Sequence, residues 1–131
     1  MGYFLDTNIA IEIGNLNDRV MARFVPNADE SYLSVLNLIE LERGIAMTPM
    51  LARARRTRLC SLLMTIPVLS FDERAAEAYG RIISQLGWVR SRDYDRMIAA
   101  HAISHQSVLV TNNEADFRDI PGLKVENWVA G

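Results

Sequence analysis

Short apolar runs alternate along the chain with longer segments in which apolar residues recur at helical spacing. The run at 107–111 is the strongest, and it lacks the polar alternation that a half-exposed strand shows. Such a run is typical of a parallel strand covered on both faces. Between Asp72 and Gly87, apolar side chains recur at i, i+4, i+7 and i+8, which predicts one face of an amphipathic helix.

This pattern predicts alternating strands and helices. Strands are expected at residues 3–6, 32–35, 67–70, 107–111 and 123–128, although 32–35 is equally well an extended lead-in to a helix. Helices are expected at 7–13, 18–25, 36–47, 49–65, 73–86 and 95–105, with a polar break at 26–29 and a loop at 88–94. We therefore expect a single α/β domain over residues 1–131, with a parallel β-sheet flanked by helices.

The composition is that of an ordinary globular domain. Half of the 131 residues are hydrophobic, 23% are charged and the formal net charge is −2, which excludes a disordered chain and a uniformly basic nucleic-acid-binding protein. No apolar run approaches the ~20 residues of a membrane span, and the first run lacks the basic start of a signal peptide. We expect a cytoplasmic protein without membrane association. The single cysteine, Cys60, excludes an internal disulfide, and its leucine neighbours predict a buried thiol.

Four acidic residues stand where apolar segments meet a turn or a helix: Asp6, Glu40, Asp95 and Asp116. Any one of them is as well explained by a helix cap or a solvated charge. In a parallel sheet, however, ligands bind beyond the carboxyl ends of the strands, where Asp6, Asp95 and Asp116 are all expected. Carboxylates gathered in one cleft repel one another unless a hard cation lies between them. The set therefore predicts a divalent-metal site.

Two glutamates compete for the fourth place in this site. On a helical wheel, Glu42 lies among core residues, whereas Glu40 shares a narrower polar strip with Asn37 and Gly44. A glutamate on a core face must be paired or functional, which favours neither residue. The small Gly44 leaves room for a ligand beside Glu40. The pattern alone leaves the choice open.

Positive charge is concentrated in two places. One is a short segment that contains Arg53, Arg55, Arg56 and Arg58. In the other, three arginines flank Asp95: Arg90, Arg92 and Arg96. The first cluster is either a solvated helix face or a surface that contacts phosphates or an acidic protein partner. The sequence leaves these alternatives open.

The motifs of the chain, taken in order, resemble a known family. They are Phe4-Leu5-Asp6-Thr7-Asn8, Ser34-Val35 with Glu40-Leu41 and Gly44, Asp95 with Met97-Ile98-Ala99-Ala100-His101-Ala102, Val110-Thr111-Asn112-Asn113 with Asp116-Phe117, and Gly122-Leu123 with Asn127-Trp128. Together they are similar to the motifs of PIN-domain ribonucleases, above all the VapC-type toxins of bacterial toxin–antitoxin pairs. The family pattern Glu-Leu-x-x-Gly falls on residues 40–44, which favours Glu40 over Glu42.

The resemblance implies a PIN-like fold and a specific site. Its acidic quartet, Asp6, Glu40, Asp95 and Asp116, would bind Mg²⁺ or Mn²⁺, and four further residues would line the site: Thr7, Asn8, Thr111 and Asn113. The implied activity is cleavage of RNA, often tRNA, and the implied partners are a VapB-type antitoxin and a second copy of the chain. Two departures concern Asp93, an additional carboxylate expected near the site, and Asp116, the family's least uniform position.

Water activated by a bound cation would leave products with a 5′-phosphate and a 3′-hydroxyl. The alternatives are a catalytically silent PIN-like module that binds RNA or protein, and a metal-dependent phosphatase. A haloacid-dehalogenase-like phosphatase requires a second aspartate two residues after the first, where this chain has Asn8. His101 and His105 have the i, i+4 spacing of a zinc pair, but no glutamate base adjoins them, so we interpret them as helix-surface histidines.

Overall fold

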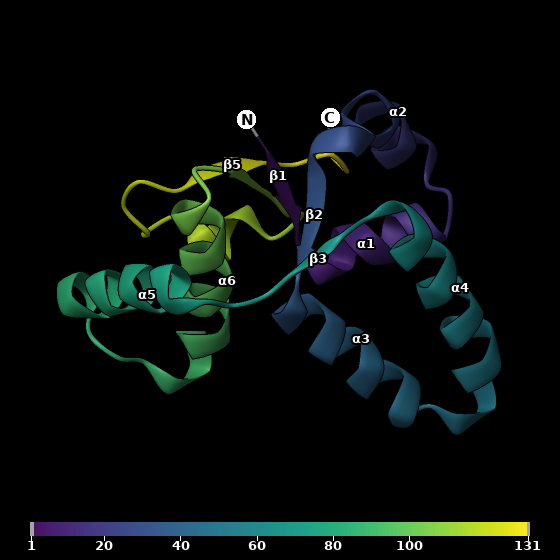
Figure 1. Ribbon diagram of the computed structural model, residues 1–131, viewed down its shortest axis with the longest axis horizontal. Helices are drawn as coiled ribbons and strands as arrows, with labels where there is room; N and C mark the ends of the chain where they lie inside the picture. The colour runs from purple at the N-terminus through teal and green to yellow at the C-terminus, as the bar shows by residue number, and fades with distance from the viewer. Residues whose placement is uncertain (1, 131) are drawn as a thin grey trace.

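The computed structural model describes residues 2–130, and within them five short strands form one parallel sheet (Figure 1). The strands are β1 (Tyr3–Leu5), β2 (Ser31–Ser34), β3 (Val68–Leu69), β4 (Val108–Val110) and β5 (Lys124–Glu126). Their order in the sheet is β3-β2-β1-β4-β5, and Tyr3 of the central strand stands opposite Ser31 on one side and Val108 on the other. This order places the carboxyl ends of β1 and β4 next to each other.

Six α-helices connect and cover the strands. They are α1 (Thr7–Gly14), α2 (Asp18–Asn27), α3 (Val35–Ala46), α4 (Ala52–Thr65), α5 (Glu73–Leu86) and α6 (Asp93–Ser104). Four 3₁₀ turns join them: η1 (Ala28–Glu30), η2 (Pro49–Leu51), η3 (Arg90–Arg92) and η4 (Glu114–Phe117). Asp6, Ser34 and Asp72 begin α1, α3 and α5 as N-caps, because each side chain accepts a hydrogen bond from a backbone N–H of the first turn.

Two hydrophobic cores lie on opposite faces of the sheet. Leu5 of β1 belongs to the core that α1, α2 and α4 cover, whereas its neighbour Phe4 belongs to the core under α5 and α6. Successive side chains of a strand point to opposite faces, and both faces of β4 are buried. In Figure 1, α5 and α6 accordingly lie on one side of the sheet, and α1 and α4 lie on the other. The predicted parallel α/β architecture is confirmed.

Three local predictions are wrong. The second helix does not end at the polar break but continues through Pro26, in its last turn, where the Asn27 side chain donates to the carbonyl of Arg23 at 2.8 Å. The helix predicted from residue 95 begins two residues earlier, at Asp93. Cys60 is exposed rather than buried, because the inward face of α4 is formed by its leucines.

The C-terminal end of the described chain closes onto the first strand. Trp128 is fully buried, and its ring lies 5.5 Å from that of Tyr3. Its Nε1–H donates to Glu126 Oε1 at 3.1 Å, and Arg23 pairs with the same carboxylate at 2.9 Å while lying over the indole ring. Trp128 is therefore part of the core, and Glu126 holds its indole N–H at the edge of it. Among residues 2–130, none of the helices has the length and apolar character that crossing a lipid bilayer requires.

Candidate active site

Asp6 stands at the carboxyl end of the central strand and is buried, with 8% of its surface exposed. Its Oδ1 accepts from the Thr7 backbone N–H at 2.9 Å, and its Oδ2 accepts from Thr111 Oγ1 at 2.9 Å and Asn8 Nδ2 at 3.3 Å. Burial raises the pKa of Asp6 and the negative charge of Glu40 adds to this, although the three hydrogen bonds oppose the rise. The hydrogen bonds hold the Asp6 carboxylate in one orientation, in a buried position where its ionised form is less favourable than in water.

Glu40 projects from α3 toward the same strand end and is partly buried. Its Oε1 accepts a hydrogen bond from the Thr7 hydroxyl at 2.5 Å. Thr7, the first residue of α1, therefore binds both carboxylates, Asp6 through its backbone N–H and Glu40 through its hydroxyl. Its Oε2 lies 3.8 Å from an Nη atom of Arg43, a distance that marks a loose ion pair.

Glu42 points away from the site. Both of its carboxylate oxygens accept from Arg56 of α4, at 2.6 and 2.7 Å, and this guanidinium lowers the pKa of Glu42. About half of the Glu42 side chain is exposed, 47%, so the wheel position on a core face is wrong. The buried residues of α3 are Asn37 and Ile45, whereas Glu42 lies on the side of the helix that meets α4, where Arg56 binds it.

Asp95 lies in the first turn of α6 and is half-buried. The pKa of Asp95 is raised to about 6. Burial is the largest cause, the negative charges of Asp6, Asp116 and Glu40 add to it, and Arg92 opposes it. Because charge–charge interactions weaken with distance, Asp6, Asp116 and Glu40 each lie near enough to Asp95 for their charges to act on it. Asp116 is the exposed member, in η4 just beyond β4.

The four residues expected to line the site all lie at this end of the sheet. Thr7 and Thr111 bind the acidic side chains directly, as described above. Asn8 bridges two segments, because it donates to Asp6 and its Oδ1 accepts from the Asn112 backbone N–H at 3.3 Å. Asn113 contributes through its backbone, whose N–H donates to Thr111 Oγ1 at 3.1 Å, and its side chain is exposed.

The donor set fits a hard, hydrated cation better than zinc. Within residues 2–130, no three carboxyl, imidazole or thiol groups already converge closely enough to hold one ion. An open set of carboxylate oxygens suits Mg²⁺, which keeps several waters and takes few protein ligands. Histidines are not part of the site. His105 is exposed, but the prediction that His101 lies on the helix surface is wrong.

His101 is fully buried between aromatic rings. Its ring lies 4.8 Å from Phe4 and 5.3 Å from Phe71, and its Nδ1 is hydrogen-bonded to Ser34 Oγ at 2.7 Å. Burial, together with the nearby His105, lowers the pKa of His101 to about 4. A neutral imidazole in this position supports the start of α3 and does not face the acidic residues.

Two side chains near the site are absent from the set that the sequence predicted. Asn37 is buried and donates to the Thr7 hydroxyl at 3.2 Å. Tyr94 donates to the Leu36 carbonyl at 2.6 Å and so ties α6 to α3; burial raises its pKa, and the nearby Glu40 adds to the rise. The one sequence signal for Asn37 is that it shares a polar strip with Glu40. Asp93, expected near the site, instead accepts from the Tyr79 hydroxyl.

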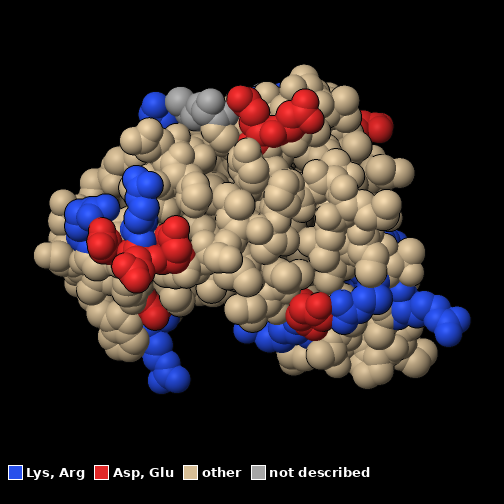
Figure 2. Space-filling view, viewed as in Figure 1, with Lys and Arg blue, Asp and Glu red and all other residues tan. Residues whose placement is uncertain are grey.

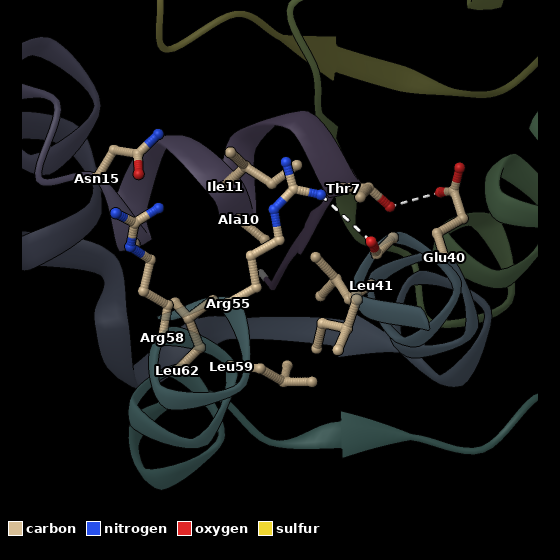
Figure 3. A pocket seen from close by; sticks show the side chains of 13 residues that line it. Thr7, Ala10, Ile11, Asn15, Glu40, Leu41, Arg55, Arg58, Leu59 and Leu62 are labelled. Carbon is tan, nitrogen blue, oxygen red and sulfur yellow. Dashed lines mark hydrogen bonds between the residues drawn. The ribbon is translucent and has the colours of Figure 1, made fainter. Parts of the chain in front are cut away.

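A groove of about 250 Å³ extends from Glu40 between α1, α3 and α4 (Figure 3). Thr7 and Glu40 stand at one end, Leu59 and Leu62 form part of its apolar wall, and two of the four clustered arginines, Arg55 and Arg58, line it. Arg55 Nη1 donates to the Gly44 carbonyl at 3.2 Å and to Thr48 Oγ1 at 3.0 Å.

The clustered arginines do not share one environment. All four are exposed on α4, but Arg56 is paired with Glu42, and only Arg55 and Arg58 line the groove beside Glu40. Figure 2 shows mainly basic side chains along the α3–α4 end of the molecule, whereas acidic and basic side chains are intermixed over α5 and α6. Arg92 lies near the acidic residues, with its Nη1 3.5 Å from the Asp116 carbonyl.

Comparisons with known proteins agree with this architecture. The model of the PIN domain matches residues 3–123. A tRNA(fMet)-specific endonuclease VapC from Salmonella typhimurium is 35% identical over 130 residues, which cover 96% of this chain and 97% of that protein. The crystal structure of DNA-bound VapBC from the same organism superposes with a TM-score of 0.87 at 32% identity, covering 98% of each chain. VapBC2 from Rickettsia felis, bound to a DNA fragment from its promoter, gives a TM-score of 0.85 at 29% identity, covering 98% and 99%.

Proposed function

The chain belongs to the PIN-domain family, among its VapC-type ribonucleases, and from this premise we propose that it is a metal-dependent endoribonuclease toxin. The observation that carries the proposal is the gathering of acidic side chains beyond β1 and β4. Asp6 and Glu40 both bind Thr7, Asp116 follows β4, and the charges of all three raise the pKa of Asp95. Four carboxylates that destabilise one another are expected where a divalent cation binds and offsets the repulsion.

In the proposed mechanism, Asp6, Glu40, Asp95 and Asp116 would hold Mg²⁺ or Mn²⁺, and the bound cation would supply a nucleophilic water at neutral pH. Hydrogen bonds from Thr111, Asn8 and the Thr7 backbone keep Asp6 in one orientation. Because water rather than the 2′-hydroxyl attacks, the products carry a 5′-phosphate and a 3′-hydroxyl.

The substrate is RNA, and the specificity named for the Salmonella typhimurium relative supports tRNA as its class. An acidic chain must concentrate positive charge where phosphates run. The arginines proposed for this contact, or for contact with the antitoxin, are Arg53, Arg55, Arg56, Arg58 and Arg92. Among them, Arg55 and Arg58 have the strongest support, because they line the groove that begins at Glu40.

We propose a VapB-type antitoxin as the partner, in line with the VapBC complexes that the fold matches, and a homodimer as the toxin's own assembly. Exposed apolar side chains such as Met50 and Trp88, 97% and 59% exposed, provide surface for such contacts. Because the proposed substrate is cellular RNA, we assign the protein to the cytoplasm.

The test is to incubate the purified protein with total RNA, with and without Mg²⁺, and to map the new 5′ ends. We expect discrete cleavage sites with 5′-phosphate ends that disappear in EDTA and in the Asp6→Ala variant. The competing function is a catalytically silent binding module. Metal-independent ends, or RNA binding without any cleavage at saturating Mg²⁺, would favour that alternative.

A further inference from the structure

A buried chain of hydrogen bonds leads from the start of α3 to Glu40. Asn37 Oδ1 accepts from the Ser34 backbone N–H at 3.0 Å, and Asn37 Nδ2 donates to Thr7 Oγ1 at 3.2 Å. Thr7 Oγ1 then donates to Glu40 Oε1 at 2.5 Å. Asn37 is 1% exposed, so water has little access to its amide group, whereas Thr7 and Glu40 are partly buried. The chain joins two segments 30 residues apart in the sequence.

The direction of every bond in this chain is determined by its first member. A backbone N–H can only donate, so the Asn37 atom that faces Ser34 must be the oxygen, and the amide nitrogen must face Thr7. The Thr7 hydroxyl has a single proton and here accepts from Asn37, so it directs that proton to Glu40. Asn37 therefore determines the orientation of the Thr7 hydroxyl.

We propose that Asn37 is a positioning residue for the proposed metal site, acting through Thr7 on Glu40. This inference rests on the proposed function and extends it beyond the four carboxylates. Thr7 binds Oε1 of Glu40 and so fixes the orientation of this carboxylate, while Oε2 makes only a loose ion pair with Arg43 at 3.8 Å and stays accessible to a cation. Partners that orient metal ligands in this way commonly contribute ten- to a hundredfold to metal affinity.

A purely structural role for Asn37 is the competing explanation, because its oxygen completes the capping box of α3 with Ser34. Asn37→Asp separates the two roles. The substituted side chain keeps the shape and the oxygen that accepts from Ser34, but it replaces the amide donor with a second acceptor. The Thr7 proton can then turn to the introduced carboxylate, and Glu40 loses its donor while the cap remains.

Thr7→Val and Thr7→Ser form the matched pair for the second link. Valine keeps the branched shape and removes the hydroxyl, whereas serine keeps the hydroxyl. The Thr7 backbone N–H bond to Asp6 is unaffected in both variants. Neither substitution changes the charge, so this pair also separates the effect of a lost hydrogen bond from the effect of the added negative charge in Asn37→Asp.

The experiment is a calorimetric Mn²⁺ titration of metal-free wild type and the three variants, with circular dichroism and thermal melts in EDTA as the check of folding. We expect Asn37→Asp and Thr7→Val to bind Mn²⁺ about ten- to a hundredfold more weakly, and Thr7→Ser to bind within about threefold of wild type. RNA cleavage at limiting Mn²⁺ should fall in parallel and recover partly at high Mn²⁺.

Each outcome has one interpretation. If wild type binds no Mn²⁺, the proposed function itself fails. If wild type binds and folded Asn37→Asp binds equally well, Asn37 only caps the helix and the inference is overturned. If Asn37→Asp does not fold, Thr7→Val decides: unchanged Mn²⁺ affinity there, or a serine variant as weak as the valine variant, overturns the inference.

Discussion

Replacing Asp95 by asparagine should stabilise the metal-free protein. Burial and three neighbouring carboxylates raise the pKa of Asp95 from 3.8 to about 6, so its ionised form destabilises the folded state. A tenfold change in proton affinity corresponds to about 1.4 kcal/mol, which sets an upper limit of about 3 kcal/mol for the gain at neutral pH. Solvent screening of this half-exposed group reduces the gain to about half.

The favourable interaction of a carboxylate with the N-terminus of α6 works against this gain and is worth about 0.3–1 kcal/mol. We therefore expect a net gain of about 0.5–1.2 kcal/mol, or a rise in Tm of about 2–4 °C for a domain of this size. The gain depends on pH. Below pH 3.8 the wild-type aspartic acid is neutral in the folded and unfolded states, and wild-type stability falls as the pH rises from there through about 6. The advantage of asparagine is therefore full above about pH 6 and absent near pH 3.

The assay is urea unfolding in EDTA at pH 7.5 and at pH 3.5, followed by circular dichroism. Asp29→Asn, at an exposed aspartate of η1 outside the site, is the matched control and should leave the unfolding midpoint unchanged. Added Mn²⁺ should stabilise wild type more than Asp95→Asn. An Asp95→Asn variant that is less stable than wild type at pH 7.5 in EDTA would refute the reasoning, because Asp95 would then be a structural residue.

Three further predictions follow from the site. Expression without an antitoxin should arrest growth, whereas Asp6→Ala at equal protein level should not; equal growth of the two strains contradicts the toxin assignment. Glu40→Gln should abolish Mn²⁺ binding in calorimetry, whereas Glu42→Gln should retain both Mn²⁺ binding and cleavage, because Glu42 only pairs with an arginine at the surface. Reversing the charge of Arg55 and Arg58 should weaken RNA binding and flatten its dependence on salt, with Mn²⁺ affinity unchanged; an unaltered salt slope would remove these residues from the RNA path.

Much of the fold could be predicted because local pattern and tertiary structure agree. The apolar run at 107–111 contains β4, and Asp72 and Gly87 bound α5 as cap and stop signal. The start of α6 could not be predicted. The helix begins at Asp93, whose carboxylate accepts a hydrogen bond from the hydroxyl of Tyr79 in the preceding helix. A propensity argument has no access to such a contact.

Asp6, Asp95 and Asp116 could be selected as candidates because each stands at the end of an apolar segment, whereas only the family motif favours Glu40 over Glu42. The orientation of the neighbouring side chains could not be predicted. Glu42 lies on the core side of a helical wheel, but α3 meets α4 there, so its carboxylate reaches Arg56 at the surface. The lack of an adjacent glutamate base favours a helix-surface histidine at position 101, yet the rings of Phe4 and Phe71 enclose His101. These environments arise only where separate elements pack together.

The burial of Trp128 against Tyr3 has a consequence for protein synthesis. β1 leaves the ribosome well before its neighbour β4 and before Trp128, which packs on Tyr3. A sheet built from such distant pairings closes only when most of the chain is available. Asp6 and Glu40 therefore emerge long before the segment that carries Asp95 and Asp116, and a nascent chain arrested before residue 108 should have no ribonuclease activity. A cell that makes this protein is therefore exposed to its activity only after synthesis has passed Asp116, and a partner that recognises the assembled site can bind only from that point.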